Sequence, residues 1–278
     1  MAYRDILVQA DTTPGSTRRL QTAAAVAAQV GADLTGVFMT TQFLRQYMAP
    51  QGVAALPPNE IDRLVREHEG AVTAAAQAAR ATFETAAREA GVTSEWTTVS
   101  GDDPGAILAS ARRSDLVVFP PRTQSSLGGY RVSAGDVALG SGGPVMVTPE
   151  EGLAGPVGRR VLVAWNGSRE AARALRDALP LVCGAEELHV LVVDPKGEGA
   201  PDAGLQRHLE RHGCTPNIIL DRSEDVRAAD VIRDQARGLN VDLIVMGLYG
   251  HARVRELMLG GVSRDFLAHP PATLLVSH

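Results

Sequence analysis

The stretch RVLVAWNGSREAARALRDALPLVCGAEELHVLVVD, residues 160–194, predicts a strand, a turn, a helix and a second strand. Its two ends are continuous apolar runs, which are typical of parallel strands buried on both faces. Between them, Ser168 stands where an N-cap residue accepts a hydrogen bond from a free backbone N–H group. The residues after it repeat at the spacing of one helix face: Ala171, Ala174, Leu175, Ala178, Leu179 and Val182. The stretch therefore predicts a β-α-β unit.

The same pattern occurs earlier, in DILVQADTTPGSTRRLQTAAAVAAQVGADLTGVFM at residues 5–39. There the apolar helix positions follow Ser16. Later segments also correspond, because DLVVFPP at 115–121 matches DLIVMGL at 242–248, and PVMVTP near residue 145 matches ATLLVSH at the end. Such internal similarity predicts a tandem repeat of one structural unit.

The repeat predicts two tandem, doubly wound α/β domains, at 1–150 and 158–278, each with a five-stranded parallel sheet and right-handed crossovers. A length of 278 residues suits two domains, and a Gly-rich linker covers residues 150–160. Corresponding segments are further apart in the first half, so we expect a helical insertion at about residues 40–70. The long helix predicted over 60–90 either presents a surface to a partner or braces the two halves, and we expect the brace.

The composition indicates a cytoplasmic protein. A formal net charge of −5 gives no general attraction to nucleic acid or to an anionic membrane. No apolar run reaches the ~18 residues of a spanning helix, and the start, MAYRDILVQAD, lacks the pattern of a signal peptide. Cys183 and Cys214 form no C-x-x-C motif, which favours reduced cysteines with packing roles. We expect no nucleic-acid partner and no membrane partner.

The last segment, residues 245–278, contains Gly247, Gly250 and Gly260 at the spacing G-x2-G-x9-G. Ligands of doubly wound sheets bind beyond the carboxyl ends of the strands. Glycines there leave backbone N–H groups uncovered, and Gly260 and Gly261 stand just before a predicted helix, VSRDFLAH, whose N-terminus favours a phosphate. The alternative is that they are only turn and cap glycines. His251, Arg253 and Arg255 can add contacts to an anion, although each also suits a solvated loop.

These residues resemble the universal stress protein family in its tandem form, most strongly over residues 159–278. The family signature is G-x2-G-x9-G-(S/T). The resemblance implies a Rossmann-like fold, similar to that of the adenine nucleotide alpha hydrolases, with strand order 3-2-1-4-5 in each domain. It also implies that the last strands of the two domains pair in an intrachain pseudo-dimer. A homodimer of whole chains and an unknown protein partner are further expectations.

The resemblance implies that the second domain binds an adenine nucleotide, ATP, with Mg²⁺ as an accompanying ion. Asn166 would lie near the ribose, and the Val192 backbone near the adenine edge. The full set of predicted nucleotide-binding residues is Ala164, Asn166, Val192, Gly247, Gly250, His251, Arg253, Gly260, Gly261, Val262 and Ser263.

Two departures from the family pattern concern this site. Gly261 replaces the family's hydroxyl residue, and Asn166 replaces its usual acidic residue. Since one neutral hydrogen bond is worth about 1 kcal/mol, the two changes would lower affinity roughly tenfold to a hundredfold. Trp165 either stacks on a base or fills the adenine pocket itself.

The first domain departs further from the pattern. Asp11 and Thr13 keep the family's D-x-(S/T), but Pro120 and Pro121 stand where the second domain has Gly247. Proline has no N–H group to donate to a phosphate. We therefore expect a degenerate first site.

The sequence supports three functional hypotheses. The first is a cytoplasmic stress-response protein that binds ATP and acts by conformation or partner binding. The second is a nucleotide-independent dimerisation or scaffold protein of the same fold, and the third is an enzyme of the related nucleotide hydrolases. No G-x-S-x-G, P-loop or H-E-x-x-H motif is present, so we predict no catalytic residues and at most slow ATP hydrolysis. His208 and His212 have a metal-ligand spacing but suit a solvated helix face, so no metal site is predicted.

Overall fold

The computed structural model describes residues 2–42, 57–123, 132–150, 156–193, 203–223, 226–248 and 261–278. The first half contains β1 (Asp5–Ala10), α1 (Pro14–Val30), β2 (Asp33–Thr40), α3 (Pro58–Ala90), β3 (Ser94–Ser100), α4 (Pro104–Ala111), β4 (Leu116–Phe119), α5 (Ala134–Ser141) and β5 (Val145–Val147). The second half contains β6 (Arg160–Ala164), α6 (Arg169–Val182), β7 (Glu187–Val193), α7 (Ala203–Arg211), β8 (Pro216–Asp221), α8 (Ala228–Gly238), β9 (Leu243–Gly247), α9 (Gly261–Ala268) and β10 (Thr273–Ser277).

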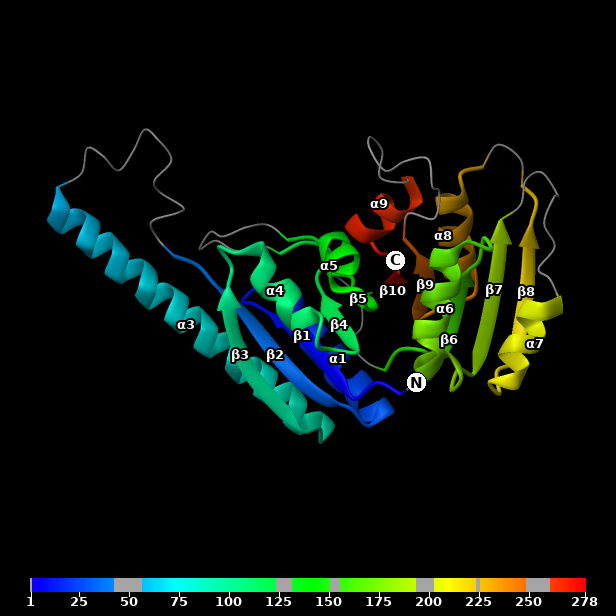
Figure 1. The fold of residues 1–278 in the computed structure, drawn as a ribbon, viewed down its shortest axis with the longest axis horizontal. Coiled ribbons are helices and arrows are strands. Elements are labelled where there is room, and N and C mark those ends of the chain that lie inside the picture. Colours follow the sequence, from blue (N-terminus) through cyan, green and yellow to red (C-terminus); the bar gives the residue numbers. More distant parts are fainter. Residues whose placement is uncertain are drawn as a thin grey trace.

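All these strands form one sheet, in the order β3-β2-β1-β4-β5-β10-β9-β6-β7-β8 (Figure 1). The predicted α/β class is confirmed, and the strands within each half are parallel in the predicted order. The two five-stranded halves join through their last strands, as the resemblance implies, so they form one sheet and not two separate parallel sheets. Strand β5 pairs antiparallel with β10, for example Met146 with Leu275, so the ten-stranded sheet is mixed. This pairing covers the backbone edges that two separate sheets would leave open.

Helices cover both faces of the sheet, and each face has a hydrophobic cluster that runs through both halves. On one face α1, α3, α6 and α7 contribute buried residues, among them Leu20, Phe83 and Ala174. On the other face α4, α5, α8 and α9 do so, with Ile107 and Phe266 as examples. The strands are therefore buried on both sides, as their continuous apolar runs predict.

Side chains also join the halves outside the sheet. The Tyr3 hydroxyl donates to the carbonyl oxygen of Asp177 in α6. Desolvation by burial, together with nearby carboxylates, raises the Tyr3 pKa well above its ordinary value, so the hydroxyl keeps its proton. Arg173 donates to the Gly142 carbonyl oxygen over 2.8 Å. Helix α6 thus contacts the first half directly.

The two corresponding helices begin differently. Ser168 caps α6 as predicted, because its Oγ accepts from the Ala171 N–H over 3.1 Å. Helix α1 instead begins at Pro14, after Thr13, whose side chain makes no capping bond. Ser16 lies inside the helix and accepts from the Asp11 N–H over 3.0 Å. Proline suits a first helical position because no N–H partner is needed there.

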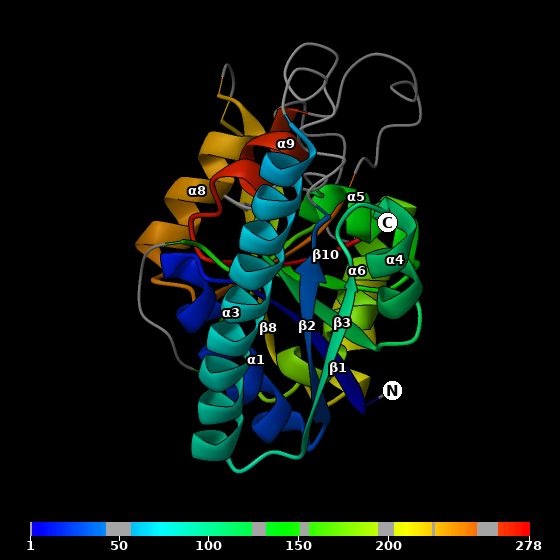
Figure 2. The same ribbon diagram turned by 90° about the vertical axis from the view of Figure 1, so that its left-hand side faces the viewer.

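The predicted long helix is α3, with 33 residues. It packs on α1 and on β1 to β3, and its Phe83 ring lies 5.5 Å from the Trp96 ring between centroids. Figures 1 and 2 show α3 along the first half, at the end of the molecule away from the second half. The expectation that it braces the two halves is therefore wrong. Within the described residues, none of the helices combines the length and apolar character needed to cross a membrane.

Candidate functional site

The carboxyl ends of three strands meet at one edge of the second half. Ala164 at the end of β6 pairs with Leu191 of β7 and with Met246 of β9. Val192 and Gly247 therefore lie one residue further along the two neighbouring strands. Three predicted site residues, Ala164, Val192 and Gly247, are brought together at this edge.

The turn after β6 carries the predicted ribose contact. Gly167 has φ +70°, in the left-handed region that favours glycine. The Asn166 side-chain oxygen accepts from the Ser168 N–H over 3.1 Å, so it holds the turn that starts α6. Asn166 is exposed at the strand edge.

The Trp165 indole is half-buried and packs against the cluster under α6 and α7. Ala164 packs against the cluster on the opposite face of the sheet. The two side chains therefore lie on opposite faces of the sheet, and both roles considered for Trp165, stacking on a base and filling the adenine pocket, stay predictions.

Gly247 has a packing role that its place in the motif did not indicate. A Cβ added there would lie 2.5 Å from the Ala171 nitrogen, and still closer to the Glu170 carbonyl carbon. The end of β9 thus touches the backbone at the start of α6. Only glycine allows this approach, whether or not a ligand is bound.

Glu170, whose backbone and Cβ pack against Gly247, carries a carboxylate at this edge. Its side chain is 11% exposed, and an oxygen lies 2.9 Å from the Arg169 guanidinium. Desolvation by burial opposes the charged form, but the residue's own backbone hydrogen bond, Arg169 and His278 outweigh it, and the pKa of Glu170 lies below its ordinary value. The group is charged at neutral pH. Sequence reasoning missed it because a glutamate in a first helical turn is common for a different reason, the helix dipole.

Helix α9 begins at Gly261, one residue before the predicted segment VSRDFLAH, with Gly261 exposed, Val262 half-buried and Ser263 buried. It connects the parallel strands β9 and β10, so its N-terminus lies at the same edge as Gly247. Helix N-termini favour anions. Gly250, His251, Arg253 and Gly260 lie outside the described residues.

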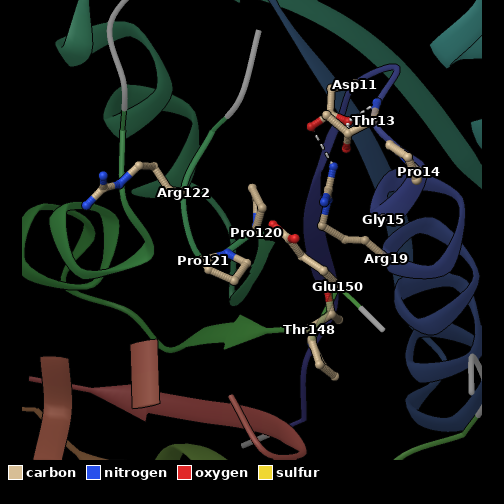
Figure 3. Close-up of a pocket in the computed structure, with 11 residues that line it drawn as sticks. Asp11, Thr13, Pro14, Gly15, Arg19, Pro120, Pro121, Arg122, Thr148 and Glu150 are labelled. Carbon is tan, nitrogen blue, oxygen red and sulfur yellow. Dashed lines mark hydrogen bonds and ion pairs between the residues drawn. The ribbon is translucent and has the colours of Figure 1, made fainter. Parts of the chain in front are cut away.

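The corresponding edge of the first half holds a cavity of about 220 Å³ (Figure 3). The buried Arg19 guanidinium donates to the Asp11 carboxylate over 2.9 Å and to the Gln9 carbonyl oxygen over 2.7 Å. Burial lowers the pKa of Arg19, an effect that Asp11 opposes. Pro120 and Pro121 form another part of the lining. The Arg19 and Asp11 charges at this edge are thus paired with each other.

Possible metal ligands are dispersed in the described part of the chain. No group of three or more His, Cys, Asp or Glu side chains there is arranged to hold an ion. The His208 and His212 rings stack edge to face, with centroids 4.8 Å apart.

Comparison with known proteins connects this architecture with a family. Residues 217–278 match the model of the Universal stress protein family. The resemblance to universal stress proteins is confirmed. The matched segment includes β9, α9 and β10, and therefore the predicted glycine signature.

Solved structures show the same fold over the whole chain. A universal stress protein from Archaeoglobus fulgidus DSM 4304 is 18% identical, with a TM-score of 0.68 over 98% of this chain and 97% of that chain. A functionally unknown protein from Pseudomonas aeruginosa PAO1 is 16% identical, with a TM-score of 0.56 over 99% and 92%. These full-length matches fit the tandem arrangement. A search of curated proteins found no match.

Proposed function

We propose that this chain is a cytoplasmic stress-response protein that binds ATP in its second half and acts through conformation or partner binding. The observation that carries the proposal is the meeting of Ala164, Val192 and Gly247 with the N-terminus of α9. Small side chains beside a helix N-terminus suit a nucleotide with its phosphates.

The residues at this edge fit ATP in part. A Cβ added to Gly261 would meet no atom of the described residues within 4 Å, so these residues leave space beside the start of α9. Asn166 would contact the ribose and the Val192 backbone the adenine, while Gly261, Val262 and Ser263 would offer groups to the phosphates. The signature residues Gly250, His251, Arg253 and Gly260 would complete the phosphate site.

Glu170 acts against this binding, because its negative charge lies beside Gly247. A bound Mg²⁺ would neutralise part of the phosphate charge and so reduce the repulsion. We therefore expect Mg²⁺ to favour ATP binding here, with the ion held chiefly by the phosphates themselves.

The proposal also includes two domain units, at 1–150 and 158–278, and a homodimer of whole chains.

The alternative is a nucleotide-independent scaffold. It is favoured by the packing of Gly247 against α6, which accounts for that glycine without a ligand, and by the charge of Glu170. In that function the main structural feature would be the pairing of β5 with β10, which joins the two halves.

Two measurements separate the candidates. Purified protein is denatured and any released small molecule is identified by mass spectrometry. Separately, the Tm is measured with and without millimolar MgATP, which should raise it by mass action. Gly250→Val should remove the rise, whereas Gly184→Val, where an added Cβ meets no atom within 4 Å, should keep it. No released nucleotide and no Tm shift would leave the scaffold function.

A further inference from the structure

The structure brings together two thiols that are 31 positions apart in the sequence. Cys183 directly follows α6, and Cys214 lies between α7 and β8. Their Sγ atoms are 3.0 Å apart. Both cysteines are free thiols, and they form no C-x-x-C motif that would indicate the contact from the sequence.

The two thiols have different environments. Cys183 is exposed, so a small solute reaches it from solvent, whereas Cys214 is 5% exposed. The Cys214 backbone is held by a hydrogen bond from its N–H to the Leu209 carbonyl oxygen over 3.0 Å. Desolvation by burial and the neighbouring Cys183 raise the pKa of Cys214 to about 12. Cys183 is therefore the thiol that meets an oxidant first, and Cys214 is held beside it.

We propose that Cys183 and Cys214 are an oxidative modification site, at which hydrogen peroxide converts the two thiols into a reversible intrachain disulfide. Contact between the sulfur atoms is the geometric condition for the second step, because an attacking sulfur must reach the first one. The proposal does not depend on nucleotide binding.

The chemistry requires only the peroxide as co-reactant. The Cys183 thiolate attacks one peroxide oxygen, the O–O bond breaks, and a sulfenic acid and water result after proton transfer. The Cys214 sulfur then gives up its proton and attacks the Cys183 sulfur. The S–O bond breaks and a second water leaves. The two thiols lose two electrons and two protons, and an external dithiol reverses the reaction.

The bond would join the end of α6 to the start of β8 and enclose β7 and α7. Closing a loop of this length restricts the unfolded chain. We expect oxidation to raise the Tm of the full-length protein by about 5–10 °C, and a reducing dithiol to reverse the rise. The disulfide would thus record exposure to peroxide as a change in the stability of the second half.

The test treats the full-length protein with hydrogen peroxide and measures its intact mass under non-reducing, denaturing conditions. The expected result is a monomer lighter by about 2 Da, with one cross-linked peptide pair containing Cys183 and Cys214. Cys183→Ser should stay unmodified under the same exposure. Cys214→Ser should instead form a sulfenic acid on Cys183 that dimedone traps. The melting curve of each variant in reducing buffer establishes that it is folded.

Three results would overturn the proposal. One is oxygen addition at Cys183 with Cys214 still a free thiol in the wild type. Another is disulfide formation only between two chains, and the last is no modification at peroxide concentrations that oxidise a small-molecule thiol.

Discussion

The strand edges of the two halves are built on the same fold but have opposite chemistry. In the first half, Arg19 is buried and its guanidinium is used by Asp11 and the Gln9 carbonyl oxygen. In the second half, Ala164 stands at the position of Gln9, and Asn166 at that of Asp11. The first edge buries an ion pair between its strand end and its helix, whereas the second has small or uncharged residues at these two positions and a charged Glu170 at the start of α6.

We infer from this difference that a ligand site on this fold depends on a few side chains at the strand ends. Both halves have the same strand order and buried apolar strands. What differs is whether the polar groups at the edge already have partners within the chain. A group that is already paired must lose that partner before it can bind a ligand, and this loss weakens binding.

Arg19→Met should destabilise the protein by about 3–5 kcal/mol, because it leaves the Asp11 carboxylate in a largely buried place without its partner. The side chains of Arg19 and Asp11 are 3% and 11% exposed. Urea denaturation measures the loss. Arg237→Met is the control, since its ion pair with Asp234 is exposed and should be worth less than about 1 kcal/mol. Equal losses in the two variants would contradict the contrast.

Gly247→Ala should cost about 1–3 kcal/mol, because the new Cβ overlaps the backbone of α6 at Glu170 and Ala171. Gly261→Ala is the matched control, since its Cβ would meet open space. Denaturation midpoints of the two variants give the comparison. Equal stability of Gly247→Ala and Gly261→Ala would contradict the claim that β9 approaches α6 too closely at Gly247 to leave room for a Cβ.

Ser168→Ala should destabilise by about 1 kcal/mol, because α6 loses the acceptor for the Ala171 N–H. Ser168→Asp keeps an acceptor and should stay near the wild type. The corresponding helix α1 depends on Pro14 instead. Thermal unfolding of both variants tests this difference. An unchanged Tm in Ser168→Ala would contradict the capping role of Ser168.

Glu170→Gln should raise the affinity for ATP about threefold, roughly 0.7 kcal/mol, because a negative charge leaves the phosphate edge. The gain should be largest without Mg²⁺. Isothermal titration of the variant against Glu186→Gln, which changes an exposed carboxylate, gives the measurement. An unchanged affinity would place Glu170 away from the ligand.

The same substitution has a predictable pH dependence. The pKa of Glu170 is lowered in the folded protein from an ordinary value of 4.5. Its charged form therefore contributes stability that is fully present above pH 4.5 and is lost as the pH falls through the folded value. Glu170→Gln should be less stable than the wild type at pH 7, with a difference that shrinks in acid. Chemical denaturation at pH 7 and pH 3.5 checks the trend.

Much of the fold was predictable because its signals are local. Apolar runs marked the strands, and the helix after Ser168 showed a regular stripe. The family resemblance supplied the pairing of the last strands. The position of α3 was mispredicted. Helical spacing shows which face of a helix is apolar, but it does not show which part of the protein that face packs against.

The site was less predictable because its decisive contacts join distant residues. Neither Glu170 beside Gly247 nor Cys183 beside Cys214 shows any pattern in the sequence. The role of Arg19 is hidden likewise, since an arginine in a helix is usually solvated. The spacing of the glycine motif identified the strand edge of the second half, but it did not identify Glu170, whose charge acts against a bound phosphate there.

Photoaffinity labelling with 2-azido-ATP, followed by peptide mapping, tests most directly the claim that the second half alone binds nucleotide. We expect label only on peptides from residues 160–278, and this label should be displaced by unlabelled ATP and lost in Gly250→Val. Label on first-half peptides from the Arg19 cavity, or label that excess ATP does not displace, would contradict it.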